Sequence, residues 1–313
     1  MTAVINTFDE LLSMASEIKG KRVAVAYANN KETCTAIALA QKKFDLSFLL
    51  TGDKEFIRKG LNDAAANTAS ITIDHCPDPK IAAQTSLGYI RNGQADILLK
   101  GSVDTATLMK LVLTEENGLR TGRLLSDVFL FEYPERQENK LIMITDGGLN
   151  LSPGIKEKID LIHNAVAVAH ALGHPHPKVA ILSVSEFVNP KLPSSVDAET
   201  LVQMNQRGQL GGCMVGGPLA LDSALWSDAA QEKGIVSPVA GYAEILLAPN
   251  IETANALAKS TTYFAHFRLA HVIVGAKVPI LITSRADKSD AKLLSIALGM
   301  VMSEDARQRT LSA

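Results

Sequence analysis

The chain has 313 residues and a formal net charge of -2, from 31 Lys and Arg against 33 Asp and Glu. This balance, with aromatic residues at 5%, excludes the basic face and stacking rings that are typical of a nucleic-acid-binding protein. A hydrophobic fraction of 47% excludes a disordered chain, and the length allows two domains.

Neither export nor membrane insertion is indicated. The first ten residues lack the basic and apolar regions of an export signal, and the apolar runs are too short to span a bilayer. The three cysteines, Cys34, Cys76 and Cys213, form no Cys-x-x-Cys pair, which is typical of a reducing compartment. We therefore expect a cytoplasmic protein.

Short apolar runs alternate with longer amphipathic segments along the chain, which is the pattern of βα units on a mostly parallel sheet. The runs lack polar alternation, as expected for strands with both faces covered by helices. We predict strands at 22–27, 46–50, 70–73, 96–100, 128–131, 141–145, 179–183, 244–248, 271–274 and 278–283.

Two helices have clear boundary signals. The first is predicted to begin at Ser152 as N-cap, with Pro153 at the first helical position, and to end before Gly173. A final amphipathic helix is predicted from 288 to about 303. The polar segment 132–140 is expected to form an exposed turn near a domain boundary.

In an open α/β sheet, ligands bind beyond the carboxyl ends of the strands, so the strand-to-helix loops are the first candidate sites. After the strand 96–100, Lys100 is followed by Gly101 and Ser102, and a helix is predicted to begin near Thr105. A cation beside a helix N-terminus favours an anion. The same pattern is also typical of an ordinary glycine turn with a helix cap.

A second loop follows the strand 141–145 and contains Asp146, Gly147, Gly148 and Asn150. The two glycines allow a ligand to approach the backbone closely, and Asp146 and Asn150 are expected to point into a cleft. An Asp-Gly-Gly turn without a function is the alternative interpretation.

Other patterns favour no site. The glycine cluster at 211–217 has the spacing of a phosphate loop, but no Lys-Ser/Thr follows it, and no Gly-x-Gly-x-x-Gly follows a strand. His174 and His176 lie between prolines without a nearby carboxylate or cysteine, which indicates a loop rather than a metal site. Trp226 is expected to pack from an Ala-rich helix.

The last candidate loop follows the strand 278–283 and contains Ser284, Arg285 and Asp287, with Asp290 close behind. Arginine is suited to a planar, bidentate grip on phosphate. Asp287 or Asp290 could serve as a base or could cap the helix that follows.

Eight stretches resemble a known family in their order and spacing, from about Lys21 to the last helix. They lie at 99–102, 118–123, 145–150, 217–222, 238–241, 248–252, 274–277 and 281–287. Leu-Lys-Gly-Ser, Thr-Asp-Gly-Gly-Leu-Asn and Leu-Ile-Thr-Ser-Arg-Ala-Asp are among them. The set resembles the phosphate acetyl/butyryltransferase family, and the butyryl enzymes more closely than the acetyl enzymes.

The resemblance implies the two-domain α/β fold of isocitrate and isopropylmalate dehydrogenases, with an active-site cleft between the domains. We place the first domain at 1–138 together with 284–313 and the second at 139–283. A homodimer or a larger homo-oligomer is implied. The implied reaction interconverts a short-chain or branched acyl-CoA and inorganic phosphate with acyl phosphate and CoA, and it requires no metal or redox cofactor.

The resemblance also assigns roles to residues. Ser284 and Arg285 match the family's catalytic Ser-Arg pair, so Arg285 is expected to hold phosphate while Ser284 hydrogen-bonds the thiolate or a phosphate oxygen. Such donors stabilise the charge that develops as phosphate attacks the thioester. Asp290 or Asp287 is the implied base for the CoA thiol in the reverse direction. The expected substrate-binding residues are Lys100, Gly101, Ser102, Asp146, Asn150 and Lys277.

The chain departs from the family pattern at several positions. Ala291 stands where the acetyl enzymes have an aspartate, Gly216 replaces the first aspartate of an Asp-Gly-Pro-Leu-Ala-Leu-Asp motif, and Met109 aligns with an arginine. Tyr242 is a further departure, within 241–244. These changes keep open a catalytically degenerate relative that binds CoA or acyl phosphate. A dehydrogenase on the same fold is the other alternative, although neither metal-binding aspartates nor a nicotinamide loop is found.

Overall fold

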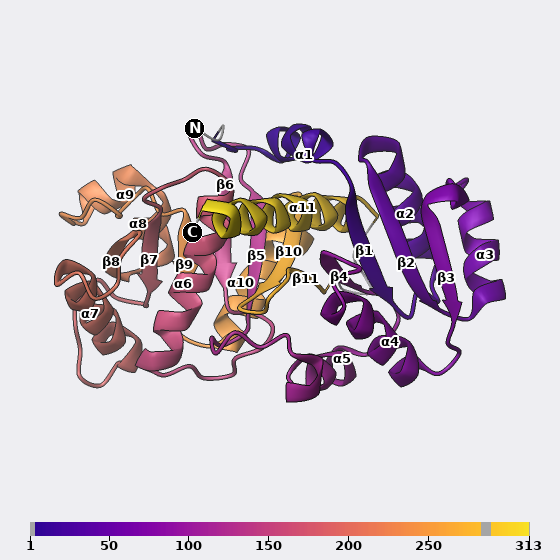
Figure 1. The fold of residues 1–313 in the computed structure, drawn as a ribbon. Coiled ribbons are helices and arrows are strands. Elements are labelled where there is room, and N and C mark those ends of the chain that lie inside the picture. The colour runs from indigo at the N-terminus through magenta and orange to yellow at the C-terminus, as the bar shows by residue number, and fades with distance from the viewer. Residues whose placement is uncertain (1–3, 283–288, 313) are drawn as a thin grey trace. The chain divides into compact units, whose positions relative to one another are not determined.

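The structure is a computed structural model that describes residues 4–282 and 289–312 (Figure 1). Internal contacts divide the chain into two compact units. Asp9–Arg123 with Ala270–Ala313 forms one, here called the Lys100 unit, and Met1–Phe8 with Leu124–Leu269 forms the other, here called the Asp146 unit. The domain boundaries expected from the sequence, 1–138 with 284–313 and 139–283, stay a prediction.

The Lys100 unit contains strands in the order β3-β2-β1-β4-β11-β10. The strands are β1 (Lys21–Ala26), β2 (Leu46–Gly52), β3 (Ile71–His75), β4 (Ile97–Lys100), β10 (Leu269–Val274) and β11 (Ile280–Leu281). All neighbours are parallel except β10 and β11, which are antiparallel. The helices are α1 (Phe8–Glu17), α2 (Lys31–Lys43), α3 (Lys54–Asp63), α4 (Pro79–Arg91), α5 (Thr105–Val112) and α11 (Ser289–Ser312), with short 3-10 turns η1 (Thr68–Ser70) and η2 (Glu115–Asn117).

The last helix, α11, extends beyond the predicted end near 303 and reaches Ser312. Its apolar face packs on α2 and β11, and this is the part that the amphipathic pattern predicts. Beyond it, Glu304 pairs with Arg307, and Asp305 pairs with Arg309. These ion pairs at i,i+3 and i,i+4 stabilise the last turns of α11, which bury no apolar face. Lys21 is buried and lies 3.1 Å from Glu304, which fixes α11 to β1.

The Asp146 unit contains strands in the order β5-β6-β9-β7-β8. The strands are β5 (Ser126–Glu132), β6 (Leu141–Thr145), β7 (Lys178–Leu182), β8 (Met214–Leu219) and β9 (Ile245–Leu247). β5 is antiparallel to β6, and the other neighbours are parallel. The helices are α6 (Ile155–Ala171), α7 (Pro193–Gln206), α8 (Leu221–Leu225), α9 (Ser227–Glu232) and α10 (Ile251–Tyr263).

Strand β8 was not predicted, because it contains Gly216, Gly217 and Pro218. Proline cannot donate to a ladder, so it is confined to positions such as the edge of a sheet. β8 is the terminal strand in the order of this unit, which explains why it tolerates Pro218.

The structure confirms two of four local expectations in this unit and corrects the other two. The N-cap of α6 is Gly154 rather than Ser152, because the Glu157 carboxylate accepts from the Gly154 amide at 3.1 Å. The predicted end is confirmed, since Gly173 follows with a φ of 86°. Trp226 does not pack from a helix: it lies between α8 and α9 and is 47% exposed. The segment 132–140 forms the turn between β5 and β6, as predicted.

Throughout the part of the chain that the structure describes, none of the helices is both long and apolar enough to cross a bilayer.

Candidate active site

Lys100 lies at the carboxyl end of β4, directly beside the end of β1. The two strands are parallel, and Lys100 is paired with Ala26 in the register. The Lys100 side chain is buried, with 4% exposed, and its Nζ donates to the carbonyls of Gly101 and Val103, each at 3.3 Å. The loop therefore holds an ammonium group at the edge of the sheet where ligands bind in α/β folds.

Gly101 is required by the close approach of β1. A Cβ at this position would lie 2.2 Å from the Tyr27 carbonyl oxygen. Because this neighbour is a backbone atom, no side-chain rotation could relieve the clash. The Gly101 amide donates to the Ala26 carbonyl at 2.9 Å, and the Ser102 amide donates to the Tyr27 carbonyl at 2.7 Å. The loop after β4 is thus bonded to the end of β1 through its backbone.

Ser102 adds a side-chain contact to this edge. Its hydroxyl accepts from the Asn30 amide at 2.7 Å, and Asn30 also caps α2 by accepting from the Thr33 amide at 2.7 Å. Asn30 was missed by the sequence reasoning, although its place between the predicted strand 22–27 and a helix is the same signal that singled out Ser102. Asp104 caps α5 by accepting from the Thr107 amide at 2.9 Å, so the ordinary capping role is also filled.

Lys277 is exposed. It lies on a loop that pairs with the stretch 118–123. The Lys277 amide donates to the Leu119 carbonyl at 3.0 Å, and Arg120 forms an isolated bridge with Ala276. The Thr121 hydroxyl donates to the Gly275 carbonyl at 2.6 Å. The stretches 118–123 and 274–277 therefore lie side by side. Arg120, which the sequence reasoning did not single out, is paired through the backbone with the residue before Lys277.

In the Asp146 unit, Asp146 is buried in the loop after β6, with 3% exposed. One carboxylate oxygen accepts from the amides of Gly148 at 2.8 Å and Leu149 at 3.1 Å. The other accepts from the Asn150 side chain, which also donates to the Leu125 carbonyl at 2.9 Å. The structure thus brings the predicted pair, Asp146 and Asn150, into direct contact.

The Asp146 carboxyl has an unusual pKa. Burial and the charge of Asp127 raise it to about 6, against the hydrogen bonds from Gly148, Asn150 and Leu149, which lower it. A carboxyl that titrates near neutral pH can exchange a proton under the conditions in which enzymes work. Perturbed groups of this kind are concentrated at functional sites.

The two glycines of this loop lie close to other segments of the same unit. Gly147 packs against the backbone of α10, where a Cβ would lie 3.4 Å from Ala254 and Asn255. A Cβ on Gly148 would lie 2.9 Å from the carboxylate of Asp127. Gly148 is therefore needed for the close approach of Asp127, whereas the contact at Gly147 is an ordinary van der Waals distance. The expectation that a ligand approaches this loop closely stays a prediction.

The described residues include only part of the predicted catalytic group. Ser284, Arg285 and Asp287 lie outside the described residues. Asp290 is exposed in the first turn of α11. It belongs to the Lys100 unit, which also contains Lys100, Gly101, Ser102 and Lys277. Asp146 and Asn150 belong to the other unit. Over 4–282 and 289–312, no group of three or more His, Cys, Asp or Glu residues could hold a metal ion.

Two departures from the family pattern have packing explanations. A Cβ at Gly216 would lie 2.6 Å from the Cβ of Val239 and 2.9 Å from the Ser237 hydroxyl, so an aspartate does not fit here. Met109 is buried on α5, with 7% exposed, whereas the adjacent Lys110 is exposed. Both residues fit their surroundings as apolar or small groups.

The mixed α/β fold is that of a phosphotransacylase. It matches the crystal structure of a branched-chain phosphotransacylase from Enterococcus faecalis V583, with a TM-score of 0.80 and 34% sequence identity, covering 91% of this chain and 99% of that one.

The chain belongs to the phosphate acetyl/butaryl transferase family, whose model matches residues 70–300. It is 43% identical over 298 residues to a probable phosphate butyryltransferase of Bacillus subtilis, covering 95% of this chain and 98% of the relative. It is 40% identical over 293 residues to a phosphate acetyltransferase of Thermotoga maritima, covering 94% and 98%. The predicted family is confirmed, and a dehydrogenase is not favoured.

Proposed function

We propose that this protein transfers a short-chain or branched acyl group between CoA and inorganic phosphate, in the reaction acyl-CoA + phosphate ⇌ acyl phosphate + CoA. The observation that carries this proposal is the family match over residues 70–300, which includes both the Lys100 loop and the Asp146 loop. The relatives named as butyryl- and acetyltransferases support an acyl group of this size.

The reaction brings two anions together. A phosphate oxygen attacks the thioester carbonyl carbon, the C–O bond forms as the C–S bond breaks, and CoA leaves as a thiolate that takes up a proton. Cations must therefore neutralise phosphate and CoA while holding them in contact. Lys100, at the edge of β4, is suited to this task, and we assign the phosphate grip to Arg285, with Ser284 as hydrogen-bond donor.

In the reverse direction a carboxylate takes the CoA thiol proton as the thiolate attacks acyl phosphate. We assign this role to Asp290 or Asp287. Asp290 is supported by its exposed place in the first turn of α11. Asp146, Asn150 and Lys277 are assigned to substrate binding.

The finer features that the resemblance implies are part of this proposal. They are the isocitrate/isopropylmalate dehydrogenase-like arrangement with a cleft between two domains, a homodimer or larger homo-oligomer, a cytoplasmic location, and a reaction without a metal or redox cofactor. Size-exclusion chromatography with light scattering tests the oligomer, and assays after chelator treatment test the metal requirement.

The activity is tested by thiol release. Purified protein is mixed with butyryl-, isobutyryl- or acetyl-CoA, and free CoA is measured with a thiol reagent in the presence and absence of phosphate. We expect release only with phosphate. If none of the three thioesters gives phosphate-dependent release, the proposed reaction is wrong.

Two variants test the assigned cations. Arg285→Ala and Lys100→Met are each expected to lower kcat/KM by about 10²-fold or more, because each removes charge stabilisation from the transition state. Lys110→Met is the matched control, since Lys110 is an exposed lysine of the same unit. Thermal unfolding of each variant separates lost chemistry from lost folding. Unchanged kinetics in either variant would remove the role assigned to that residue.

A catalytically degenerate relative remains the second candidate, and Met109 is the observation that favours it. The arginine expected at this position is replaced by Met109, which is buried on α5 and carries no charge. Calorimetry that detects CoA binding, together with thiol assays that detect no release, would favour this candidate over the transferase.

A further inference from the structure

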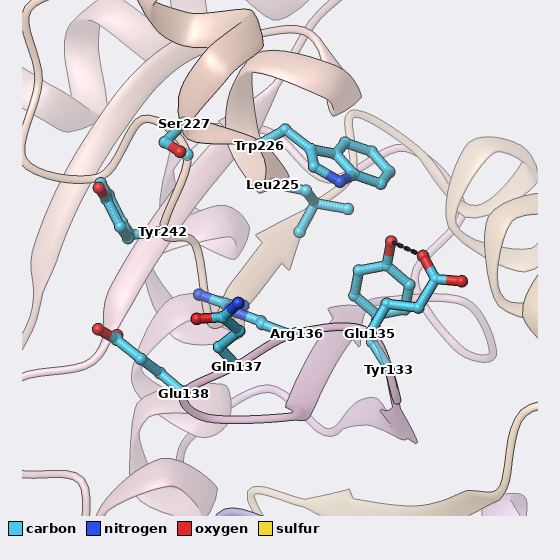
Figure 2. Close-up of a pocket in the computed structure, with 10 residues that line it drawn as sticks. Tyr133, Glu135, Arg136, Gln137, Glu138, Leu225, Trp226, Ser227 and Tyr242 are labelled. Carbon is cyan, nitrogen blue, oxygen red and sulfur yellow. Dashed lines mark hydrogen bonds between the residues drawn. The ribbon is translucent and has the colours of Figure 1, made fainter.

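The Asp146 unit contains a cavity of about 390 Å³ that the proposed reaction does not use (Figure 2). Three segments line it: the turn between β5 and β6, the junction of α8 and α9, and the segment before β9. The lining residues that matter here are Tyr133, Arg136, Gln137, Trp226, Ser227 and Tyr242.

This cavity lies at the amino-terminal ends of β6 and β9, whereas the Asp146 loop follows the carboxyl end of β6. The turn between β5 and β6 precedes Leu141, the first residue of β6, whereas Asp146 follows Thr145, the last residue. Tyr242 likewise precedes β9, which runs parallel to β6. The five residues of β6 separate its two ends by roughly 17 Å, at about 3.4 Å per residue. The cavity is therefore distinct from the Asp146 loop.

Arg136 is half-buried at this cavity, and its guanidinium has more N–H donors than the described residues pair with. Its guanidinium donates a hydrogen bond to the Ala243 carbonyl at 2.6 Å. Among the described residues, no carboxylate forms an ion pair with Arg136 within 4.0 Å. Burial lowers its pKa, and the charges of Glu244 and Glu138 offset this only in part. A guanidinium in this state gains from an anion that pairs with its remaining N–H groups.

Aromatic rings supply an apolar surface beside Arg136. The chain has one Trp and five Tyr, and the cavity contains the Trp and two of the Tyr residues. Trp226 and Tyr242 are 47% and 43% exposed, and Tyr133 meets Trp226 edge-on with ring centroids 5.9 Å apart. Figure 2 shows Arg136 and Gln137 on one wall, with Trp226 and Leu225 facing them from another segment. Rings with accessible faces favour a ligand with an apolar or planar body.

The charge around the cavity selects among anions. Glu138 is exposed on the same turn as Arg136, and the charges of Glu244 and Glu138 both act on its guanidinium. The Lys178 ammonium lies over the Tyr242 ring, 4.6 Å from its centroid. A dianion or polyanion such as phosphate or CoA would gain one ion pair while facing two like charges. A monoanion avoids most of this repulsion. The rim thus favours a single carboxylate and disfavours the substrates of the proposed reaction.

We propose that this cavity binds a small monocarboxylate with an apolar or planar body, its carboxylate paired with Arg136 and its body against Trp226 and Tyr242. The site is independent of the acyl-transfer reaction and needs no turnover to be detected. All the residues that line the cavity belong to the unit that carries Asp146.

Trp226 is the only tryptophan of the chain, so its fluorescence reports on this cavity alone. The full-length protein is titrated with phenylacetate, and we expect a saturable change in emission with a Kd of about 1 mM or tighter. Phenylacetamide, the uncharged analogue, tests the carboxylate, and phenyl phosphate tests the preference for a monoanion. Phenylacetamide is expected to bind at least about tenfold more weakly, because its charge-assisted bond is lost. Phenyl phosphate is expected to bind at least about tenfold more weakly, because its second charge faces the nearby carboxylates.

Two variants test the residues. Arg136→Gln keeps a donor for the Ala243 carbonyl and is expected to weaken phenylacetate binding about tenfold or more. Tyr242→Leu keeps Trp226 and Arg136 and is expected to weaken binding through the lost ring. Arg207→Gln, at the exposed end of α7, is the matched control and should bind as the unaltered protein does.

The proposal is overturned by equal binding of phenylacetate and phenylacetamide, by unchanged binding in folded Arg136→Gln, or by the absence of a saturable signal. These outcomes are separate from the transferase assay, because the titration contains neither CoA nor phosphate. A protein that binds phenylacetate but releases no thiol would support the cavity and contradict the proposed activity.

Discussion

Asn150 and Asp146 are joined by a hydrogen bond in which the Asn150 side-chain amide donates to the Asp146 carboxylate. The same amide donates to the Leu125 carbonyl at 2.9 Å, which fixes the orientation of the Asn150 side chain. This relationship explains the spacing of the Thr-Asp-Gly-Gly-Leu-Asn stretch. The loop returns on itself within four residues, and its asparagine supplies a donor that the buried carboxylate requires.

Removal of this donor is expected to raise the pKa of Asp146 above its present value of about 6. Because the folded-state pKa already exceeds the ordinary value of 3.8, the stability associated with Asp146 is full below pH 3.8 and falls as pH rises through about 6. Asn150→Ala should therefore lose about 1–3 kcal/mol of unfolding free energy, with a larger loss at pH 8 than at pH 5. Urea unfolding at the two pH values measures this.

Asn255→Ala is the control for this prediction. Asn255 donates to the Gly147 carbonyl at 2.9 Å, so it holds the same loop without contacting a charged group. Its loss should be similar at both pH values. A loss in Asn150→Ala that is equally independent of pH would contradict the role of the amide as a donor to an ionising carboxylate.

Much of the fold could be predicted from the sequence because both faces of the strands are covered. Continuous apolar runs located β1, β2, β4 and β6, whose buried residues leave little ambiguity. β8 could not be found in this way, because Gly216, Gly217 and Pro218 are poor strand residues and only its place at the edge makes them acceptable. A single sequence does not show which strand is at an edge.

The site was predictable in its loops and less so in its contacts. Lys100 and Asp146 were found because each directly follows an apolar strand. The pKa of Asp146 depends on burial and on Asp127, which lies in a different strand, so no local pattern shows it. Asn30 and Arg120 reach the candidate loops through pairings between distant segments. Such residues are found only when the register of neighbouring strands and loops is known.

Gly101 is expected to tolerate no side chain. In Gly101→Ala the Cβ would lie 2.2 Å from the Tyr27 carbonyl oxygen, and this neighbour is backbone, so β1 and the Lys100 loop must separate. We expect a loss of about 3 kcal/mol or more in unfolding free energy, and loss of thiol-release activity in any folded fraction. Thermal unfolding and the phosphate-dependent assay measure both effects.

Gly88→Ala is the matched substitution for Gly101→Ala. Gly88 lies inside α4, and nothing lies within 4 Å of its Cβ position. Alanine should stabilise the helix there by about 0.5–1 kcal/mol. If Gly101→Ala unfolds no more easily than Gly88→Ala, the Tyr27 contact does not constrain the loop.

His174 is expected to make stability depend on pH. Burial alone would lower its pKa, but bonds to the Glu244 carboxylate at 3.2 Å and to the Ile5 carbonyl at 2.9 Å raise it overall. Both partners only accept, so both ring nitrogens must carry protons. The pKa of Glu244 is lowered in return, despite its burial, by His174, Asn139 and the Lys178 amide.

The two shifts define a pH window. The stability from His174 is full below its ordinary pKa of 6.5 and is lost as pH rises through the higher folded-state pKa. The stability from Glu244 is full above its ordinary pKa of 4.5 and is lost as pH falls through the lower folded-state pKa. His174→Gln should therefore destabilise the protein by about 1.5–3 kcal/mol near pH 6, with a smaller effect at pH 9.

Urea unfolding across this range measures the effect, and His176→Gln is its control, because His176 is exposed on the same loop. Histidine NMR signals give the folded-state pKa directly. A His174 that titrates at or below 6.5 would show that the Glu244 and Ile5 contacts do not outweigh burial.

Thr145 provides the last prediction, because its hydroxyl is buried without a partner. Of the side-chain polar atoms in the described part of the chain, its Oγ1 is the one that is buried and forms no hydrogen bond. An unpaired buried hydroxyl costs about 1–3 kcal/mol, so Thr145→Val should raise the unfolding free energy by about 1 kcal/mol. Thr51→Val is the counterpart: the Thr51 hydroxyl, also fully buried, contacts the Ala82 carbonyl at 3.0 Å and the Ser86 hydroxyl at 2.9 Å. That variant should lose stability by about 1–3 kcal/mol, since its partners are left unpaired. Opposite signs in the two unfolding experiments are expected, and a destabilised Thr145→Val would show that this hydroxyl has a partner in solution.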